Sequence, residues 1–170
     1  MAITPDAARI KVGPARTGLG LFAAKSIKPG ERIIRVEGRI VHHRLLWRKQ
    51  GSTFSANCFR FGPETYLDPG DGLGRYLNHS CEPNAGIQKA ENRLFLFATK
   101  RIGAGSEISI DYSTTIGDDD IWTMRCKCGS ERCRKTIRNF GSLPADLKHR
   151  YVKRGLVPQY VIRTLAERIP

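Results

Sequence analysis

The stretch RYLNHSCEPN, Arg75 to Asn84, is the most informative part of this chain. It places two asparagines, a histidine and a thiol between two strand-like runs that are rich in Tyr and Phe. Three further motifs surround it: TGLGLFAAKSIKPGE (Thr17 to Glu31), EISIDY (Glu107 to Tyr112) and CKCGSERC (Cys126 to Cys133). Each motif taken alone is compatible with ordinary structure, so the information lies in their order.

The composition indicates one basic domain. A chain of 170 residues can bury a core without covalent cross-links. Lys and Arg number 29 against 16 acidic residues, which gives a net charge of +13, and residues 126–170 hold 11 basic and 3 acidic residues. This excess favours nucleic acid or an acidic partner. A solvated helix surface is the alternative interpretation.

The sequence also predicts the compartment. No run approaches the ~18 apolar residues of a membrane span, and MAITPDAARIKVG lacks the basic start and apolar core of a signal peptide. Three of the five cysteines fall within eight residues, which suits a reducing compartment and a metal better than disulfides. We therefore expect a cytoplasmic protein, or a nuclear, chromatin-associated one if the source is eukaryotic.

Short β-like runs separated by Gly and Pro dominate the first two thirds of the chain, which makes the predicted fold mainly β. A short helix is expected around Arg44–Lys49 and a loop over Ser113–Asp120. The predicted strands are Arg9–Val12, Gly20–Ala24, Arg32–Glu37, Thr65–Asp68, Ala85–Lys89, Arg93–Thr99 and Glu107–Ile110.

The chain changes character after Phe140, where two helices are expected. Ser142 can cap a helix that begins at Leu143–Pro144 and stops at Gly155. A second helix is predicted from Pro158 to about Arg168.

Cys126, Cys128 and Cys133 provide three soft metal ligands on a tight turn that Gly129 permits. Zinc takes four ligands in a tetrahedral array, so the fourth must come from elsewhere. The candidates are Cys58, Cys81 and the four histidines. Reduced core cysteines are the alternative.

The other motifs have simple structural interpretations too. The turn Gly18-Leu19-Gly20 can be a bare hairpin turn, although missing side chains also let a ligand approach the backbone. Asn78 and His79 can be a satisfied polar pair, and Tyr112 can be a packing residue at the end of a strand.

In this order the motifs resemble those of SET-domain protein lysine methyltransferases with a zinc-binding post-SET segment. The resemblance covers Ile10 to Ile137. It implies a SET-type β-clip fold of short sheets with a knot-like C-terminal crossing, a post-SET zinc turn and a short helical tail. The implied division is a SET catalytic domain (9–115), a post-SET zinc-binding segment (116–138) and a basic helical C-terminal extension (139–170).

The resemblance implies transfer of methyl groups from S-adenosyl-L-methionine to a lysine ε-amine of a histone or other basic protein. Cys81 would complete the zinc site of Cys126, Cys128 and Cys133, which leaves Cys58 as a small buried apolar residue. Tyr112 would be the catalytic residue and Asp111 a structural partner. The implied cofactor-binding residues are Gly18, Leu19, Gly20, Arg75, Asn78, His79, Tyr112 and Ile137, the last as an apolar lid on the adenine. Tyr66, Tyr76 and Ile110 are candidates for the lysine channel.

Three positions depart from the family pattern. Val36 stands where an aromatic residue is common, Arg39 where an acid is common, and Ile110 where Phe or Tyr is frequent. Ile110 favours more than a single methyl addition. Val36 and Arg39 leave open an alternative, a non-catalytic zinc-stapled module that binds nucleic acid or an acidic partner. The sequence specifies neither the substrate protein nor the oligomeric state.

Overall fold

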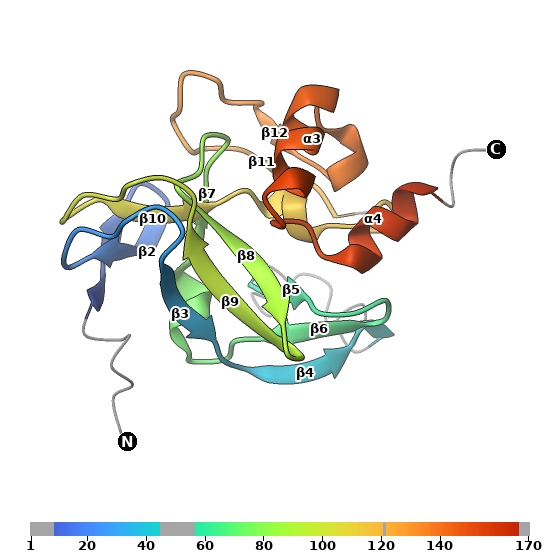
Figure 1. Cartoon of the computed structure of the whole chain (residues 1–170), viewed down its shortest axis with the longest axis horizontal. Helices are drawn as coiled ribbons and strands as arrows, with labels where there is room; N and C mark the ends of the chain where they lie inside the picture. Colours follow the sequence, from blue (N-terminus) through green and yellow to red (C-terminus); the bar gives the residue numbers. More distant parts are fainter. Residues whose placement is uncertain (1–8, 45–56, 121, 167–170) are drawn as a thin grey trace.

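The computed structural model describes residues 9–44, 57–120 and 122–166. Figure 1 shows several small sheets, with the longer helices gathered in the C-terminal part. The mainly β fold class is therefore confirmed. Within the described ranges, no helix is long and apolar enough to cross a membrane.

A four-stranded sheet forms one side of the molecule, in the order β1-β2-β10-β7. β1 (Ile10–Ala15), β2 (Gly18–Ala23) and β10 (Glu107–Ile110) pair in antiparallel fashion. β7 (Asn78–His79) instead runs parallel to β10, with Asn78 opposite Ser109. This pairing brings the Asn-His dipeptide beside the strand that leads to Tyr112.

Three smaller sheets complete the β structure, and a short 3₁₀ helix, η2 (Leu73–Tyr76), precedes β7. The first is ordered β3-β9-β8, the second β4-β6-β5, and the third is the pair β11-β12. Their strands are β3 (Arg32–Val36), β4 (Arg39–His42), β5 (Phe59–Arg60), β6 (Thr65–Asp68), β8 (Ala85–Ala90), β9 (Arg93–Ala98), β11 (Met124–Arg125) and β12 (Thr136–Ile137).

The core lies between these sheets and follows the strand alternation of the sequence. Leu94, Leu96 and Ala98 point inward from β9, and Ile108 and Ile110 do so from β10. Each such fully buried Leu or Ile side chain contributes roughly 1.5–3 kcal/mol relative to exposure. The core therefore fixes the register of β10 and the place where that strand ends.

Two predictions in this part need correction. The first strand runs past Val12 and includes Pro14, which an edge strand tolerates. The expected loop Ser113–Asp120 begins inside a 3₁₀ helix, η3 (Tyr112–Thr115), because the Asp111 side chain accepts a hydrogen bond from the Ser113 N–H and caps it. The helix expected around Arg44–Lys49 falls almost wholly outside the described residues.

The C-terminal part contains η4 (Phe140–Ser142), α3 (Ala145–Lys153) and α4 (Gln159–Ala166). Two helices were expected and two are found, but the proposed cap at Ser142 is wrong. The Ser142 hydroxyl donates to the carbonyl of Asn139 at 2.7 Å, and α3 begins after Pro144 without a side-chain cap. Gly155 follows α3 with a φ of 65°, in the left-handed region that suits glycine at a helix end.

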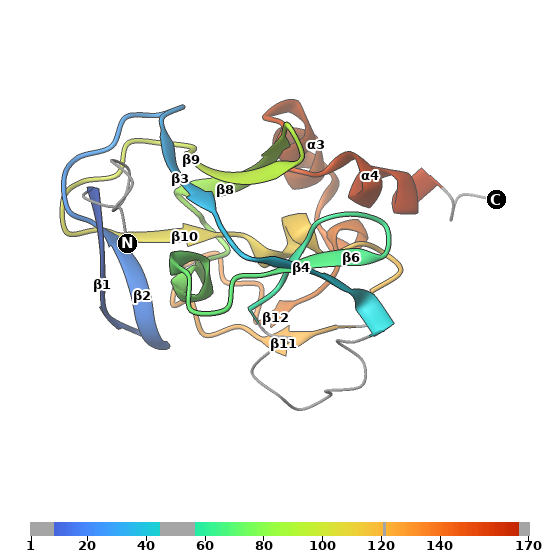
Figure 2. The same ribbon diagram turned by 90° about the horizontal axis from the view of Figure 1, so that it is seen from below.

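Figures 1 and 2 show α3 and α4 together on the side of the molecule away from the β1–β2 hairpin. They form a hydrophobic cluster of their own. This cluster rests on β8, where a Cβ at Gly86 would lie 2.6 Å from Leu156. The Gln88 side chain also donates to the carbonyl of Arg154 at 3.0 Å. The two helices are therefore an integral layer of the fold.

Candidate active site and metal centre

The parallel pair β7–β10 is held by a side chain as well as by the backbone. The Ser80 N–H donates to the Ile110 carbonyl at 2.9 Å. Asn84 donates to the Glu107 carbonyl at 2.7 Å and accepts from the Ser109 N–H at 2.9 Å. Asn84 is the last residue of RYLNHSCEPN, but its local sequence does not reveal that its side chain bonds to β10.

Tyr112 lies directly after β10 and is fixed at both ends. Its hydroxyl donates to the Leu77 carbonyl at 2.6 Å, and its N–H donates to Nδ1 of His79 at 3.1 Å. Burial, with a smaller contribution from Glu107, raises the pKa of Tyr112 to about 12. Its ring centroid lies 5.4 Å from that of His79 and 6.4 Å from that of Trp122. Tyr112 is therefore a neutral phenol in a fixed orientation.

The segment Gly18-Leu19-Gly20, predicted as a turn, instead begins β2, and the bend of the hairpin falls at Arg16-Thr17. This segment meets Asn78 across β10. The Asn78 amide donates to the Leu19 carbonyl at 3.1 Å and to the Glu107 carboxylate at 2.7 Å. A Cβ at Gly20 would lie 2.6 Å from that carboxylate, and Gly18 has a φ of 106°. Gly18 is therefore required by its backbone conformation, and Gly20 by the close approach of Glu107 and Asn78.

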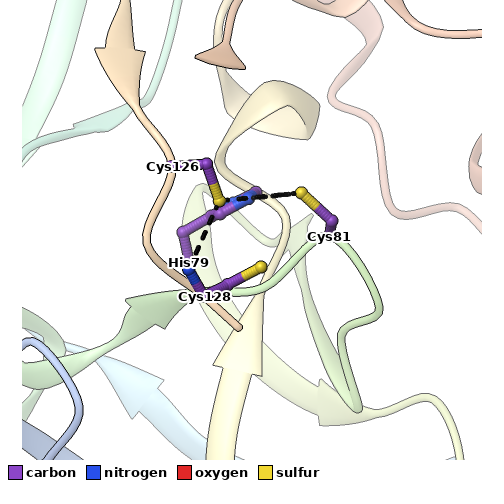
Figure 3. Close-up of side chains that lie close together, drawn as sticks. All are labelled: His79, Cys81, Cys126 and Cys128. Carbon is purple, nitrogen blue, oxygen red and sulfur yellow. Dashed lines mark hydrogen bonds between the residues drawn. The ribbon is translucent and has the colours of Figure 1, made fainter. Parts of the chain in front are cut away.

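Figure 3 shows four side chains that point toward one another: His79, Cys81, Cys126 and Cys128. Their donor atoms all lie within 4.8 Å of one another. Burial raises the pKa of Cys126. Burial acts in the same direction at Cys128, but hydrogen bonds from Cys81 and Ser130 outweigh it and lower the pKa of Cys128 to about 6. A thiolate is thus favoured at the centre of the cluster.

The donor set fits zinc. The sulfurs of Cys81 and Cys126 are 3.7 Å apart. A tetrahedron with zinc–sulfur bonds of ~2.3 Å has edges of ~3.8 Å, whereas a disulfide would need ~2.05 Å. Backbone N–H groups also reach these sulfurs, from Cys128 to Cys126 at 3.5 Å and from Arg134 to Cys81 at 3.3 Å.

Cys133 and His79 compete for the fourth ligand position. Cys133 packs against the cluster, and its thiol interacts with that of Cys126. His79 is neutral, because burial lowers its pKa to about 4. Its Nδ1 accepts the Tyr112 N–H, so the proton of the neutral ring sits on Nε2, which faces the Cys81 sulfur at 3.3 Å. His79 therefore points its Nε2–H at the Cys81 sulfur. Cys133 is not among the four side chains whose donor atoms lie within 4.8 Å of one another, so its role as the fourth ligand stays a prediction.

Asp111 is a buried carboxylate with three donors around it. It accepts hydrogen bonds from the Ser113 N–H, from the Arg134 guanidinium at 2.7 Å and from the Tyr151 hydroxyl at 3.0 Å. Its side chain is fully buried. Sequence reasoning predicted a structural partner at Asp111 but missed Arg134 and Tyr151, because contacts over 23 and 40 residues leave no local pattern.

A profile described as "SET domain" matches residues 18–113, more than half of the chain. The chain belongs to the SET-domain family.

Relatives of this SET domain are histone-lysine methyltransferases by name. Histone-lysine N-methyltransferase trr of Drosophila melanogaster is 34% identical over 69% of this chain, and human Histone-lysine N-methyltransferase 2D is 31% identical over 69%. The chain spans only 5% and 2% of the lengths of these two proteins.

Solved structures agree on the SET fold. The methyltransferase domain of human Histone-lysine N-methyltransferase SETMAR superposes with a TM-score of 0.63 at 26% identity, over 76% of this chain and 58% of that one. KRYPTONITE, solved in complex with mCHH DNA, an H3(1-15) peptide and SAH, gives 0.59 at 23% identity, over 76% of this chain and 29% of that one.

Two apolar residues expected at the SET-domain site are fully buried. Ile137, the predicted adenine lid, packs with Cys81, Ile116 and Cys126 on the zinc side of the site. Ile110, the predicted channel residue, packs in the main core. The lid and channel roles stay predictions.

The remaining predicted site residues already have partners. The Arg75 guanidinium pairs with Asp71 at 2.8 Å and lies over the Tyr76 ring. Tyr76 is half-buried and packs against the main core. The Tyr66 hydroxyl donates to Asp120, so this predicted channel wall is tied to the loop before the cysteine turn.

The departures from the family pattern are accommodated by the fold. Val36 is buried in the main core, and Arg39 is an exposed residue that pairs with Asp68 at 3.6 Å. Cys58 is only partly buried, not fully as expected, and burial and Asp68 raise its pKa to about 12.

A pocket of about 700 Å³ lies beside the cysteine turn. Arg16 extends from the β1–β2 hairpin to line this pocket, and its guanidinium packs against Gly129. None of the described residues that line it is acidic. Its lining residues are Arg16, Arg125, Cys126, Lys127, Gly129, Ser130, Cys133 and Lys135.

His42, His43 and Glu64 form a second, more exposed group of metal-capable side chains. Hydrogen bonds among the side chains and the backbone explain why these three residues lie together without a metal. His42 Nδ1 accepts from the Arg44 N–H at 3.3 Å, and His42 Nε2 contacts Glu64 at 3.4 Å.

Proposed function

We propose that this chain is an S-adenosyl-L-methionine-dependent protein-lysine N-methyltransferase with a structural zinc. The main support is Tyr112, whose hydroxyl is fixed by the Leu77 carbonyl beside Asn78 and His79. The names of the relatives point to the same activity and to histones as the substrate class. A histone substrate would place the protein on chromatin.

The chemistry asked of Tyr112 is orientation rather than proton removal. A lysine amine has a pKa of ~10.4 and must lose a proton before it can attack a methyl group. Tyr112, with its pKa raised to about 12, is a weak candidate for that base at neutral pH. Its hydroxyl donates to Leu77, so an oxygen lone pair is left to accept from the incoming amine.

S-adenosyl-L-methionine supplies an electrophilic methyl group on a sulfonium. We assign its binding to the segment Gly18-Leu19-Gly20, to Asn78 and His79, and to the pocket beside the cysteine turn. The methionine carboxylate is its anionic group, and Arg16 stands two residues before Gly18 in that cation-lined pocket. Arg16 is the residue that we expect to meet the carboxylate.

The zinc, bound by Cys81, Cys126, Cys128 and Cys133, holds the segment 116–138 against the site. Cys81 follows Asn78 and His79 by a few residues, and the other three cysteines lie in the C-terminal segment. One metal therefore joins the cofactor side of the site to the segment that carries Ile137.

Transfer from methyl-labelled S-adenosylmethionine to core histones tests the function. We expect label on lysine, located by mass spectrometry of the modified residues. Tyr112→Phe should retain cofactor binding and lose transfer by at least roughly a hundredfold. A Tyr112→Phe variant with wild-type transfer would remove Tyr112 from the mechanism.

A second candidate function is nucleic-acid binding, which the cation-lined pocket favours. Part of the positive charge of the C-terminal segment is neutralised within the chain, since Arg134 pairs with Asp111 and Arg150 pairs with Asp146. Binding to duplex DNA should weaken with added salt, with a log–log slope of about −0.9 per phosphate neutralised. A flat salt response would exclude phosphate contacts.

A further inference from the structure

One buried hydrogen bond connects the C-terminal helices to Asp111, which lies between β10 and Tyr112. Tyr151, on α3, donates its hydroxyl to Oδ2 of Asp111 at 3.0 Å. Both side chains are buried, and Asp111 immediately precedes Tyr112. The SET domain profile matches residues 18–113, so Tyr151 lies outside the matched segment.

The two oxygens of Asp111 have different partners. Oδ1 receives the Arg134 guanidinium and the Ser113 N–H, and Oδ2 receives the Tyr151 hydroxyl. Burial and Asp111 raise the pKa of Tyr151, which therefore remains a proton donor. Without Tyr151, Oδ2 would have no hydrogen-bond donor among the contacts that the structure gives it.

Asp111 sets the backbone that follows it. Its side chain caps η3, and its carbonyl accepts from the Thr114 N–H at 3.0 Å and from the Thr114 hydroxyl at 2.8 Å. Tyr112 is the first residue of η3. A rotation of the Asp111 carboxylate would therefore displace the Tyr112 backbone, together with its hydrogen bond to His79.

The helix that carries Tyr151 is anchored independently. Leu156 packs on Gly86 of β8, and Phe140 donates its N–H to the Ile116 carbonyl at 2.9 Å. Thr164 of α4 accepts from the Asp118 N–H at 3.1 Å. The hydroxyl of Tyr151 is thus presented to Asp111 from a fixed layer.

We propose that Tyr151 is a positioning residue of the methyltransferase site, which orients Asp111 and, through it, Tyr112. The proposal rests on the function proposed above. It gives the C-terminal extension a part in the reaction, since the extension supplies one of the donors that define the end of β10.

Tyr151→Phe removes the hydroxyl and keeps the ring. Tyr160→Phe is the matched control, because Tyr160 lies in the same hydrophobic cluster and donates its hydroxyl to the Arg60 carbonyl, away from Asp111. Both variants lose one hydrogen bond, and Tyr151→Phe should lower the free energy of unfolding more, because its acceptor is a buried carboxylate and that of Tyr160 is a backbone carbonyl. With core histones as substrate, we expect kcat of Tyr151→Phe to fall roughly tenfold while KM and the cofactor Kd change less than about twofold. Tyr160→Phe should keep kcat within about twofold of wild type.

The backbone amide resonance of Tyr112 provides a readout without turnover. It should shift in Tyr151→Phe and stay in place in Tyr160→Phe. Equal losses of kcat in the two variants, or an unmoved Tyr112 amide in Tyr151→Phe, would overturn the positioning role. If wild-type protein transfers no methyl group, the proposed function fails, and a catalytic role for Tyr151 fails with it. The amide shift still reports in that case whether Tyr151 holds Tyr112.

Discussion

The backbone N–H of Tyr112 donates to His79, and the same imidazole faces the thiol of Cys81 with its other nitrogen. The His79 side chain thus connects Tyr112, the candidate catalytic residue, to Cys81, a candidate metal ligand. The geometry requires a neutral ring with its proton on Nε2. It also explains why Asn-His and the cysteine occur so close together in the sequence.

The metal assignment gives the first prediction. Zinc-loaded protein should contain one zinc per chain by elemental analysis. Cys133→Ser and Cys81→Ser should lower that occupancy, because each removes one of four thiolates. His79→Gln should retain the metal, since His79 acts as a hydrogen-bond donor to Cys81. Cys58→Ser is the matched control. Retention of full zinc by Cys133→Ser together with loss in His79→Gln would reverse the assignment of the fourth ligand.

Alkaline pH provides the second prediction. Tyrosine in an unfolded chain titrates near ~10, whereas burial and Glu107 raise the pKa of Tyr112 to about 12 in the folded protein. Between these values the unfolded state has lost the proton and the folded state retains it, so the free energy of unfolding falls as pH rises. Tyr112 should account for on the order of 2 kcal/mol of that fall.

Urea unfolding at several pH values above 9 measures this loss. Tyr112→Phe should lose stability less steeply than wild type over the same range. An identical slope in the two proteins would mean that Tyr112 titrates normally.

Arg60 carries the third prediction. Its side chain is only 3% exposed and pairs with Asp119 at 2.6 Å and Asp120 at 2.8 Å, which ties the loop before the cysteine turn to the β4-β6-β5 sheet. Arg60→Ala should lower the free energy of unfolding by about 3–5 kcal/mol, because Asp120 is left with an uncompensated charge. Arg39→Ala, which breaks the exposed pair with Asp68, should cost less than about 1 kcal/mol. Similar costs for the two variants would contradict a buried clamp.

The fourth prediction concerns Gly20. A methyl group there would meet the Glu107 carboxylate and the Asn78 amide, so Gly20→Ala should destabilise the fold by about 1–3 kcal/mol. Gly103→Ala is the control, since the nearest atom to its added Cβ is the Ser106 hydroxyl at 3.5 Å. Thermal unfolding compares the two. A Gly20→Ala variant as stable as Gly103→Ala would mean that the segment Gly18-Leu19-Gly20 is not packed against Asn78.

Most of the strands could be predicted because they alternate in a regular way, as β9 and β10 do. The gathering of Cys81, Cys126 and Cys128 could be predicted as well, Cys126 and Cys128 from their spacing and Cys81 from the family resemblance. His79 joins the same group, which the spacing of the cysteines does not reveal. Ser142 illustrates a failure: a good capping residue instead bonds to Asn139, since the chain first makes a 3₁₀ turn at Phe140.

The site was harder to predict wherever a contact joins distant segments. Asn84, Arg134 and Tyr151 have ordinary sequence surroundings, and each acquires its role only when the fold brings it to β10 or Asp111. The contact between the Tyr66 hydroxyl and Asp120 likewise joins distant segments, and the place of Tyr66 in a lysine channel stays a prediction.

The central claim is that zinc completes a cofactor site formed by the segment Gly18-Leu19-Gly20, Asn78, His79 and Tyr112. Calorimetric titration with S-adenosylmethionine, on the zinc-loaded protein and on the same protein after chelation, tests it most directly. We predict one cofactor per zinc-loaded chain, binding at least roughly tenfold weaker after chelation, and recovery when zinc is returned. Equal affinity with and without the metal, or no saturable binding by the zinc-loaded protein, would contradict the account.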